Sequence, residues 1–307
     1  MSSTPPEVLL RVRDLEREAF EQAIGAMGLR AVQQPTAGVA PALAFIDPDA
    51  MGGTDALARV QRAALAYPRT PVLLMSGPQQ RALLAAFVEV PTVAGVVGRD
   101  TQERDRELDD ALKLVVNGPN FGVSRLVAAD SPVFSRELAS SVDREDLLEA
   151  ARAFLLDRGI RPRMADLAQN AIEELITNAI YDAPTDSSGR RLYADVDRRN
   201  AVFLPSGARP RLDLAVEGKT IAAVMTDPHG SLDVATVRRY LAMGLRGDFS
   251  EKPGGAGLGF ARVFGLVDRL IVQITPRVCT EIAFTLQAGA VRRDPSARPT
   301  GLLAWGA

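Results

Sequence analysis

The chain has 307 residues, which predicts two domains on a scale of roughly 100–200 residues per domain. The formal net charge of −2 gives no electrostatic case for binding nucleic acid or an anionic membrane, and shares of 47% hydrophobic and 24% charged residues argue against wholesale disorder. The single cysteine excludes an internal disulfide. No apolar run reaches the length of a membrane span, so we expect a cytoplasmic protein that does not span a membrane.

Residues 1–118 are predicted to form a domain built on a doubly wound parallel sheet. Short apolar runs bounded by Pro, Gly or Asp indicate buried strands at Val8–Val12, Ala42–Ile46, Pro71–Met75 and Val93–Val97. Helical stretches lie between and after these runs, at about 15–27, 54–67, 79–87 and 102–116. Alternating strands and helices of this size are typical of parallel βαβ units.

A second domain is predicted over residues 135–290, after a linker at 119–134. Two long helical stretches, 142–158 and 163–181, precede two hairpins. The hairpin strands are Arg211–Val216 with Thr220–Thr226, and Leu270–Thr275 with Cys279–Gln287. Helices on one side of a mostly antiparallel sheet make an α+β sandwich. With the doubly wound parallel sheet of the first domain, the chain as a whole is expected to belong to the α/β class. Residues 291–307 are expected to form a loosely attached tail.

The helix predicted over Met164–Asp182 carries a polar stripe beside its apolar one. Asn170, Glu174, Asn178 and Asp182 recur four residues apart and therefore share one face. A solvated helix face has the same pattern, but asparagine is a poor residue for a helix interior. A carboxylate one turn from an amide can also activate a hydroxyl while the amide oxygen helps to hold Mg²⁺.

Two further motifs follow along the chain. Asp227-Pro228-His229-Gly230 ends a strand and is typical of a turn, although an aspartate fixed there can also accept a hydrogen bond from an exocyclic amine. The run Gly254–Phe260 contains four glycines and leads into a helix, which favours the approach of an anion. No Gly-Lys-Ser/Thr follows it and no strand precedes it directly, so it matches neither a P-loop nor a dinucleotide-binding fold.

Taken in order, these motifs resemble the ATP-binding domain of the GHKL superfamily, which has the Bergerat-type fold. The superfamily includes histidine kinases, gyrase-type topoisomerases, mismatch-repair ATPases and anti-sigma-factor serine kinases. The resemblance covers about residues 135–290 and is strongest at Glu174–Ala179 and Gly254–Phe260.

The resemblance implies a role for each matching residue. Glu174 matches the general base, Asn178 the Mg²⁺ ligand and Asp227 the aspartate that reads adenine. The remaining nucleotide-binding positions are implied to be Gly230 in the aspartate box, Gly255, Gly257, Leu258 and Gly259 on the phosphate side, Thr280 beside the adenine, Asp182 as a looser match, and Lys252 at the end of a helical lid, Leu232–Pro253. A solvated surface lysine is the alternative interpretation of Lys252.

The aspartate box departs from the family pattern at two positions. His229 and Ser231 stand where glycines are usual, and their bulk is expected to narrow the nucleotide pocket and favour binding over turnover. His229 is also the only histidine of the chain, so no phosphoacceptor histidine precedes the ATP-binding domain. Any phosphoryl transfer is therefore expected to go to a partner, as in the anti-sigma-factor kinases.

The first domain resembles a response-regulator receiver whose site is degenerate. Asp47 follows a buried strand at the position of the receiver phosphoacceptor, and Ser76 matches the switch hydroxyl. Arg13-Asp14 replaces the acidic pair that holds Mg²⁺ in receivers, and the expected lysine falls near Gly98-Arg99. Asp47 is thus a candidate phosphoacceptor without its metal site, or a turn residue in a pseudo-receiver used for docking or dimerisation.

Three hypotheses on function follow from these resemblances. The first is a signalling protein of the two-component type that binds ATP and Mg²⁺ and phosphorylates a partner's serine, threonine or histidine, with the pseudo-receiver for docking or regulation. The second is a non-catalytic, nucleotide-gated interaction module, and the third is a scaffold with a dead pocket. The expected partners are ATP and a signalling protein rather than nucleic acid, and a homodimer stays open.

Overall fold

The computed structural model describes residues 5–50, 55–76, 86–98, 108–113, 118, 122–246, 258–289 and 301–306. The chain is α/β and divides into two compact units, which we call the N-terminal unit (1–120 with 300–303) and the C-terminal unit (121–299 with 304–307). Within the described ranges, each helix is too short or too polar to cross a membrane.

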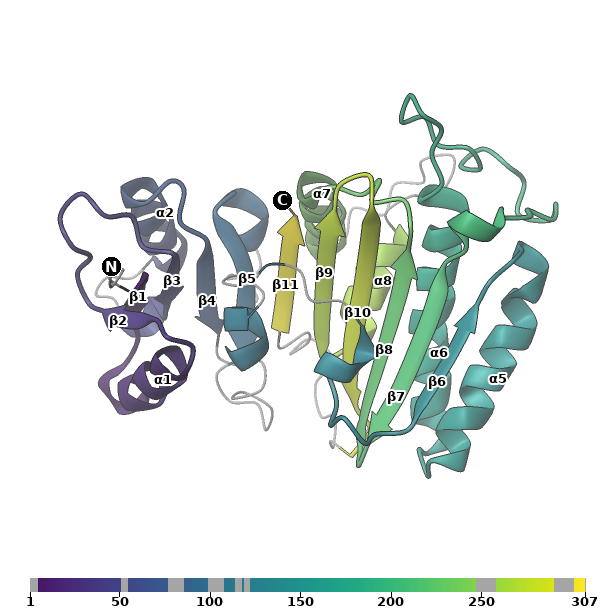
Figure 1. The fold of residues 1–307 in the computed structure, drawn as a ribbon, viewed down its shortest axis with the longest axis horizontal. Coiled ribbons are helices and arrows are strands. Elements are labelled where there is room, and N and C mark those ends of the chain that lie inside the picture. Colours follow the sequence, from purple (N-terminus) through teal and green to yellow (C-terminus); the bar gives the residue numbers. More distant parts are fainter. Residues whose placement is uncertain are drawn as a thin grey trace. The chain divides into compact units, whose positions relative to one another are not determined.

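The N-terminal unit is built on a parallel sheet in the order β2-β1-β3-β4-β5 (Figure 1). The strands are β1 (Glu7–Arg11), β2 (Arg30–Val32), β3 (Leu43–Ile46), β4 (Val72–Ser76) and β5 (Val93–Gly98). The helices are α1 (Asp14–Ala26) and α2 (Ala56–Ala66), with a 3-10 turn, η1 (Pro48–Ala50), and further helical residues at 86–89 and 108–113.

Burial on both faces explains why four of these strands read as continuous apolar runs in the sequence. Every residue of β3 and β5 is buried, as parallel strands covered by helices require. The edge strand β2 differs, because it has only three residues and is at least partly exposed, and its sequence gave no strand signal. The predicted helices at 79–87 and 102–116 lie largely outside the described residues.

The predicted tail is wrong for residues 301–306, which form the strand β11 (Gly301–Gly306). Leu302 and Leu303 pair antiparallel with β5 of the N-terminal unit and are 1% and 2% exposed. Gly95 of β5 permits this pairing, because a Cβ there would clash with the Leu302 carbonyl and the Leu303 side chain. The burial of this leucine pair is what makes the segment a strand rather than a tail.

The C-terminal unit is an antiparallel sheet with its helices on one face, in the strand order β9-β10-β8-β7-β6 (Figure 1). The strands are β6 (Val133–Glu137), β7 (Arg211–Glu217), β8 (Thr220–Asp227), β9 (Arg269–Thr275) and β10 (Cys279–Gln287). The helices are α5 (Arg144–Asp157), α6 (Pro162–Thr177), α7 (Val234–Arg246) and α8 (Leu258–Leu266). Short 3-10 turns are η2 (Val123–Arg125), η3 (Ser141–Asp143) and η5 (Ser206–Ala208). Helix α6 packs against both α5 and α8, and α7 packs against α8.

Part of the expected linker, 119–134, is anchored in the C-terminal unit. Arg125 of η2 forms an ion pair with the fully buried carboxylate of Glu281 on β10, and the backbone N–H of Gly122 donates to the same carboxylate. Burial raises the pKa of Glu281, while the charge of Arg125 lowers it. Because Glu281 alternates with Thr280 along β10, this ion pair lies on the opposite side of the sheet from the Thr280 side chain.

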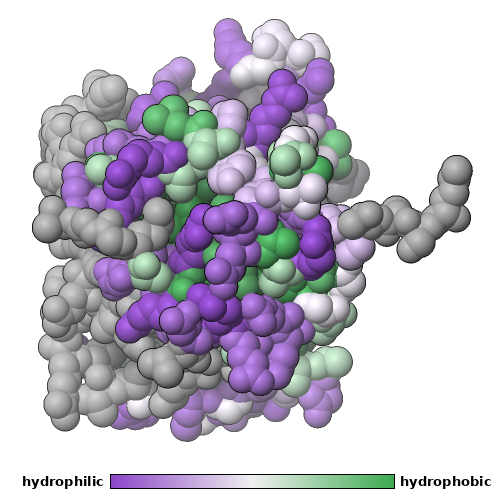
Figure 2. Space-filling model, turned by 90° about the vertical axis from the view of Figure 1, so that its left-hand side faces the viewer, coloured by the Kyte–Doolittle hydropathy of each residue, from purple (hydrophilic) through white to green (hydrophobic). Residues whose placement is uncertain are grey.

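The surface seen in Figure 2 is mostly hydrophilic, with its apolar side chains in small scattered groups. Isolated apolar residues of this kind are normal on protein surfaces.

Candidate functional site

Helix α6 presents one apolar face to the core and ends in a π-helical turn. Pro162 stands at its first turn, where a missing N–H costs nothing, and Ala168, Ala171, Ile172, Leu175 and Ile176 are at most 1% exposed. From Asn178 to Asp182 the helix widens to a π-helix, in which the N–H of Ala183 donates to the Asn178 carbonyl at 2.9 Å. Such π-turns occur frequently at functional sites.

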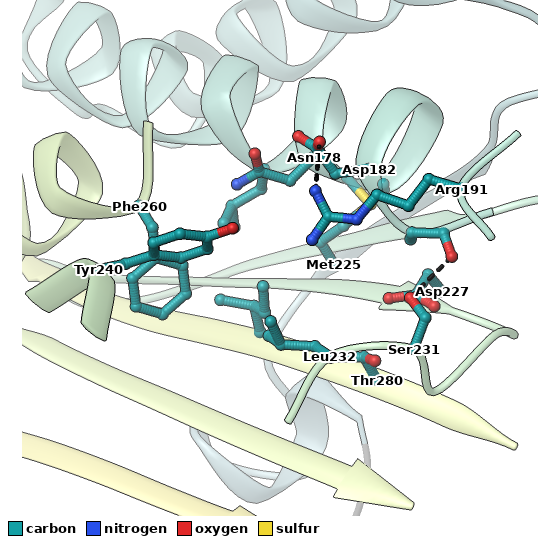
Figure 3. A pocket seen from close by; sticks show the side chains of 14 residues that line it. Asn178, Asp182, Arg191, Met225, Asp227, Ser231, Leu232, Tyr240, Phe260 and Thr280 are labelled. Carbon is teal, nitrogen blue, oxygen red and sulfur yellow. Dashed lines mark hydrogen bonds and ion pairs between the residues drawn. The ribbon is translucent and has the colours of Figure 1, made fainter. Parts of the chain in front are cut away.

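A pocket of about 60 Å³ lies between this helix and the sheet (Figure 3). Its polar lining includes four residues that the sequence predicted, Asn178, Asp182, Asp227 and Thr280. The other lining residues are Leu175, Ala179, Ala183, Arg191, Met225, Ser231, Leu232, Tyr240, Phe260 and Ile282. The walls are therefore mainly apolar, with a few polar groups between them, which is the usual composition of a small-molecule site.

Asp227 is a buried carboxylate at the end of β8. Burial raises its pKa to about 6, although the His229 N–H, the Thr280 hydroxyl and the Gly230 N–H lower it. The His229 N–H donates to Asp227 Oδ1 at 2.9 Å. Thr280 is the cross-strand partner of Asp227, and its buried hydroxyl lacks a hydrogen bond of normal geometry within the described part of the chain. This end of the pocket thus places a buried carboxylate beside a hydroxyl whose hydrogen-bonding capacity the described residues do not satisfy in full.

The turn after Asp227 requires glycine at position 230, and its histidine, His229, does not line the pocket. Gly230 has φ +56°, and a Cβ there would lie 2.7 Å from the backbone nitrogens of Arg277 and Val278. Of the two residues expected to narrow the pocket, His229 is not among the lining residues. Ser231 does line it, and its hydroxyl donates to the Ala183 carbonyl at 2.7 Å.

Glu174, one turn before Asn178, lies against the start of α8. A Cβ at Gly259 would clash with the Glu174 carboxylate and would lie 3.8 Å from Asn178 Oδ1. Glycine at this position therefore allows α8 to approach two of the predicted site residues closely. The other carboxylate oxygen of Glu174 accepts a hydrogen bond from Arg262 of α8 at 3.0 Å.

The remaining predicted positions of the glycine loop cannot be related to this geometry. Lys252, Gly255 and Gly257 lie outside the described residues, and Leu258 begins α8. Within the predicted lid, α7 covers Val234–Arg246.

Sequence reasoning missed Arg191, Tyr240 and Phe260. Arg191 stands in an irregular loop and forms an ion pair with Asp182, with 3.1 Å between Nη1 and Oδ1 (Figure 3). Burial raises the pKa of Asp182, although Arg191 and Arg198 lower it. In the sequence, Arg191 is one of many arginines in a segment without periodicity, and only its contacts distinguish it.

In the N-terminal unit, the candidate phosphoacceptor Asp47 has no exposed surface and is held by Arg13. Arg13 Nε donates to Asp47 Oδ2 at 3.2 Å, and the N–H of Asp49 donates to Oδ1 at 2.9 Å. Both residues follow the carboxyl ends of neighbouring parallel strands, β1 and β3, at the point where the strand order reverses. Ligands bind at such switch points in open α/β sheets. Here an arginine side chain takes that position.

Comparison with known proteins places the chain in no family, because no family model matches the sequence and no curated protein matches it either.

Proposed function

We propose that the C-terminal unit binds ATP with Mg²⁺ in this pocket, as in the GHKL superfamily, and phosphorylates a partner protein on serine, threonine or histidine. The observation that supports the proposal is the meeting of three separate sequence motifs. Asn178 and Asp182 of the helix stripe and Asp227 at the end of β8 line one mainly apolar pocket, and Gly259 at the start of α8 lies against Glu174 and Asn178 beside it.

The end of the pocket at Asp227 suits the amino edge of a purine. A carboxylate in an apolar site can accept a hydrogen bond from an exocyclic amine, and the Thr280 hydroxyl can bind a water molecule or a ring nitrogen beside it. Met225, Leu175 and Ile282 supply apolar surface for the flat ring. Removing a hydrogen-bonding partner from such a site leaves buried polar atoms unpaired, which makes the site selective for ligands with a matching amine.

The end at α8 suits a phosphate chain with its metal ion. Gly259 lies at the first turn of α8, where backbone N–H groups attract anions. Mg²⁺ commonly takes only one or two protein oxygens and completes its shell with phosphate and water, so Asn178 with Glu174 nearby is a sufficient set. Bound Mg²⁺ would supply positive charge for the phosphates.

Glu174 is the general base in this proposal. Its carboxylate would take the proton of the acceptor as the acceptor attacks the terminal phosphorus, and ADP would leave with the electron pair of the broken bond. The N-terminal unit would serve as a pseudo-receiver for docking or regulation, because Arg13 occupies the switch point beside Asp47.

The second candidate is a nucleotide-gated interaction module without catalysis. The observation that favours it is the hydrogen bond from Arg262 to Glu174 Oε1, because it occupies a carboxylate oxygen that a general base would use to reach the acceptor. In that case nucleotide would bind and reorganise the surface, but no phosphoryl group would move.

Calorimetric titration with ATP, with and without Mg²⁺, tests the nucleotide site. We expect binding that depends on Mg²⁺ and that Asn178→Ala weakens about tenfold or more, the scale of one lost buried polar contact. Asn170→Ala, two turns earlier on the same helix face and exposed, is the matched control and should bind as the wild type does. Absence of binding at millimolar ATP would refute the proposed site.

Glu174→Gln separates the two candidate functions. In the kinase, this variant should keep the ATP affinity of the wild type within about twofold and lose about 10²–10⁴-fold in ATP turnover, which general-base catalysis contributes. A wild-type protein that binds ATP but turns it over no faster than Glu174→Gln does would favour the interaction module.

A further inference from the structure

Three side chains from separate parts of the C-terminal unit meet in the pocket. Asp182 belongs to the π-helix, Arg191 to the loop that follows it, and Tyr240 to α7 (Figure 3). Arg191 forms the ion pair with Asp182 at 3.1 Å; burial lowers the pKa of Arg191, but the neighbouring Tyr240 and Asp182 together raise it by more. We call these three residues the clasp. The clasp connects α7 to the π-helix through the Arg191 guanidinium.

The clasp leaves too little room for a nucleobase beside Asp227. The pocket encloses about 60 Å³, whereas sites for ligands of that kind start at about 300 Å³. The sheet and α6 are packed elements that cannot withdraw without loss of the core. The Arg191 and Tyr240 side chains are the parts of the lining that rotation about side-chain bonds can remove, since both are long and only partly buried.

The ion pair within the clasp is easily broken. The side chains of Arg191 and Asp182 are 37% and 20% exposed. Each charge therefore loses part of its hydration, while the remaining solvent still screens the attraction between them. Burial raises the pKa of Asp182 despite the arginines near it, which is the mark of incomplete compensation. Arg198, which lies over the Tyr181 ring and also lowers the pKa of Asp182, leaves that carboxylate with a second cation when Arg191 moves.

We propose that Arg191 is an internal gate of the pocket: the clasp holds its side chain across the cavity, and a ligand enters only when Arg191 and α7 move away. The chemical class of that ligand, a purine nucleotide, rests on the proposed function. The gate itself rests on the contacts of the clasp. Its two consequences are a restrained α7 without ligand and a lower affinity than the open pocket would have.

The first test uses no ligand. Hydrogen exchange of the α7 amides between residues 237 and 243 is measured in the wild type, Arg191→Ala and Arg190→Ala. Arg190 is the matched control, because it is the adjacent, exposed arginine outside the pocket lining. We expect Arg191→Ala to speed exchange about two- to fivefold, the effect of losing a partly exposed ion pair, and Arg190→Ala to leave it unchanged. Equal exchange in all three proteins would overturn the gate whether or not nucleotide binds.

The second test measures the affinity of the same proteins for ADP with Mg²⁺. A gate predicts that Arg191→Ala binds ADP about two- to fivefold more tightly than the wild type, because no clasp has to open. Weaker binding would make Arg191 a ligand contact and refute the gate. Failure of all three proteins to bind ADP would refute the proposed function, while the exchange rates would still decide on the clasp. Circular dichroism of each variant checks that it is folded.

Discussion

Asp227→Asn is expected to raise the stability of the protein while it impairs the pocket. The Asp227 side chain is almost completely buried, and among the described residues it has no ion pair that would offset the lost hydration. Asparagine keeps an oxygen for the hydrogen bond from His229, and its amide can donate to the Thr280 hydroxyl. The substitution thus removes the buried charge and retains the hydrogen bonds of the turn.

The magnitude follows from the pKa of Asp227, which burial raises from 3.8 to about 6. Because the folded carboxyl holds its proton more tightly than the unfolded one, its contribution to stability is complete below pH 4 and is lost as pH rises through 6. The difference corresponds to about 3 kcal/mol of free energy of unfolding. Asp227→Asn, which does not titrate, should therefore exceed the wild type by up to about 3 kcal/mol at pH 7.5 and by very little near pH 4.

Urea unfolding at pH 4.5, 6.0 and 7.5 measures this difference. The control is Asp213→Asn, an equally buried aspartate that has an ion pair with Arg211 at 3.0 Å and a hydrogen bond from the Ser135 hydroxyl at 2.6 Å. Loss of charge at Asp213 should reduce stability at pH 7.5, because it removes an existing partner. The reasoning is refuted if Asp227→Asn is no more stable than the wild type at pH 7.5, or if its gain does not depend on pH. The same variant should bind ATP about tenfold or more weakly.

Two further predictions concern packing and the N-terminal unit. Gly259→Ala should change the free energy of unfolding by no more than about 1 kcal/mol, since the flexible Glu174 carboxylate can move aside, but ATP turnover should fall because the base is displaced. Gly230→Ala should lower the free energy of unfolding by about 3 kcal/mol or more, because the new Cβ would face backbone atoms at a positive φ. Equal stability of the two variants in urea would contradict this contrast. Arg13→Ala should destabilise the N-terminal unit by about 1–2 kcal/mol, because it loses the hydrogen bond to buried Asp47. Arg13→Lys should destabilise it less, because lysine keeps the positive charge. If both variants unfold at the same temperature as the wild type, the pair contributes nothing to stability.

The sequence by itself located most strands and helices of both units, because their signals are local. A parallel strand buried on both faces is a continuous apolar run, as at Leu43–Ile46, and a packed helix repeats its apolar residues every three or four positions, as in Pro162–Thr177. The sequence also selected Asp227, Asn178 and Thr280, which line one pocket. Their roles in binding ATP stay a prediction.

Tertiary structure decided the features that depend on distant partners. Leu302 and Leu303 form a strand only because β5 offers an edge to pair with, and the three residues of β2 carry too little pattern to predict. The contacts of Arg191 with Asp182 and Tyr240 have no local signature either, since an arginine in an irregular loop reads the same whether it points to solvent or into a cavity. Periodicity records which face of an element is buried, but it does not record which long side chain from another segment reaches that face.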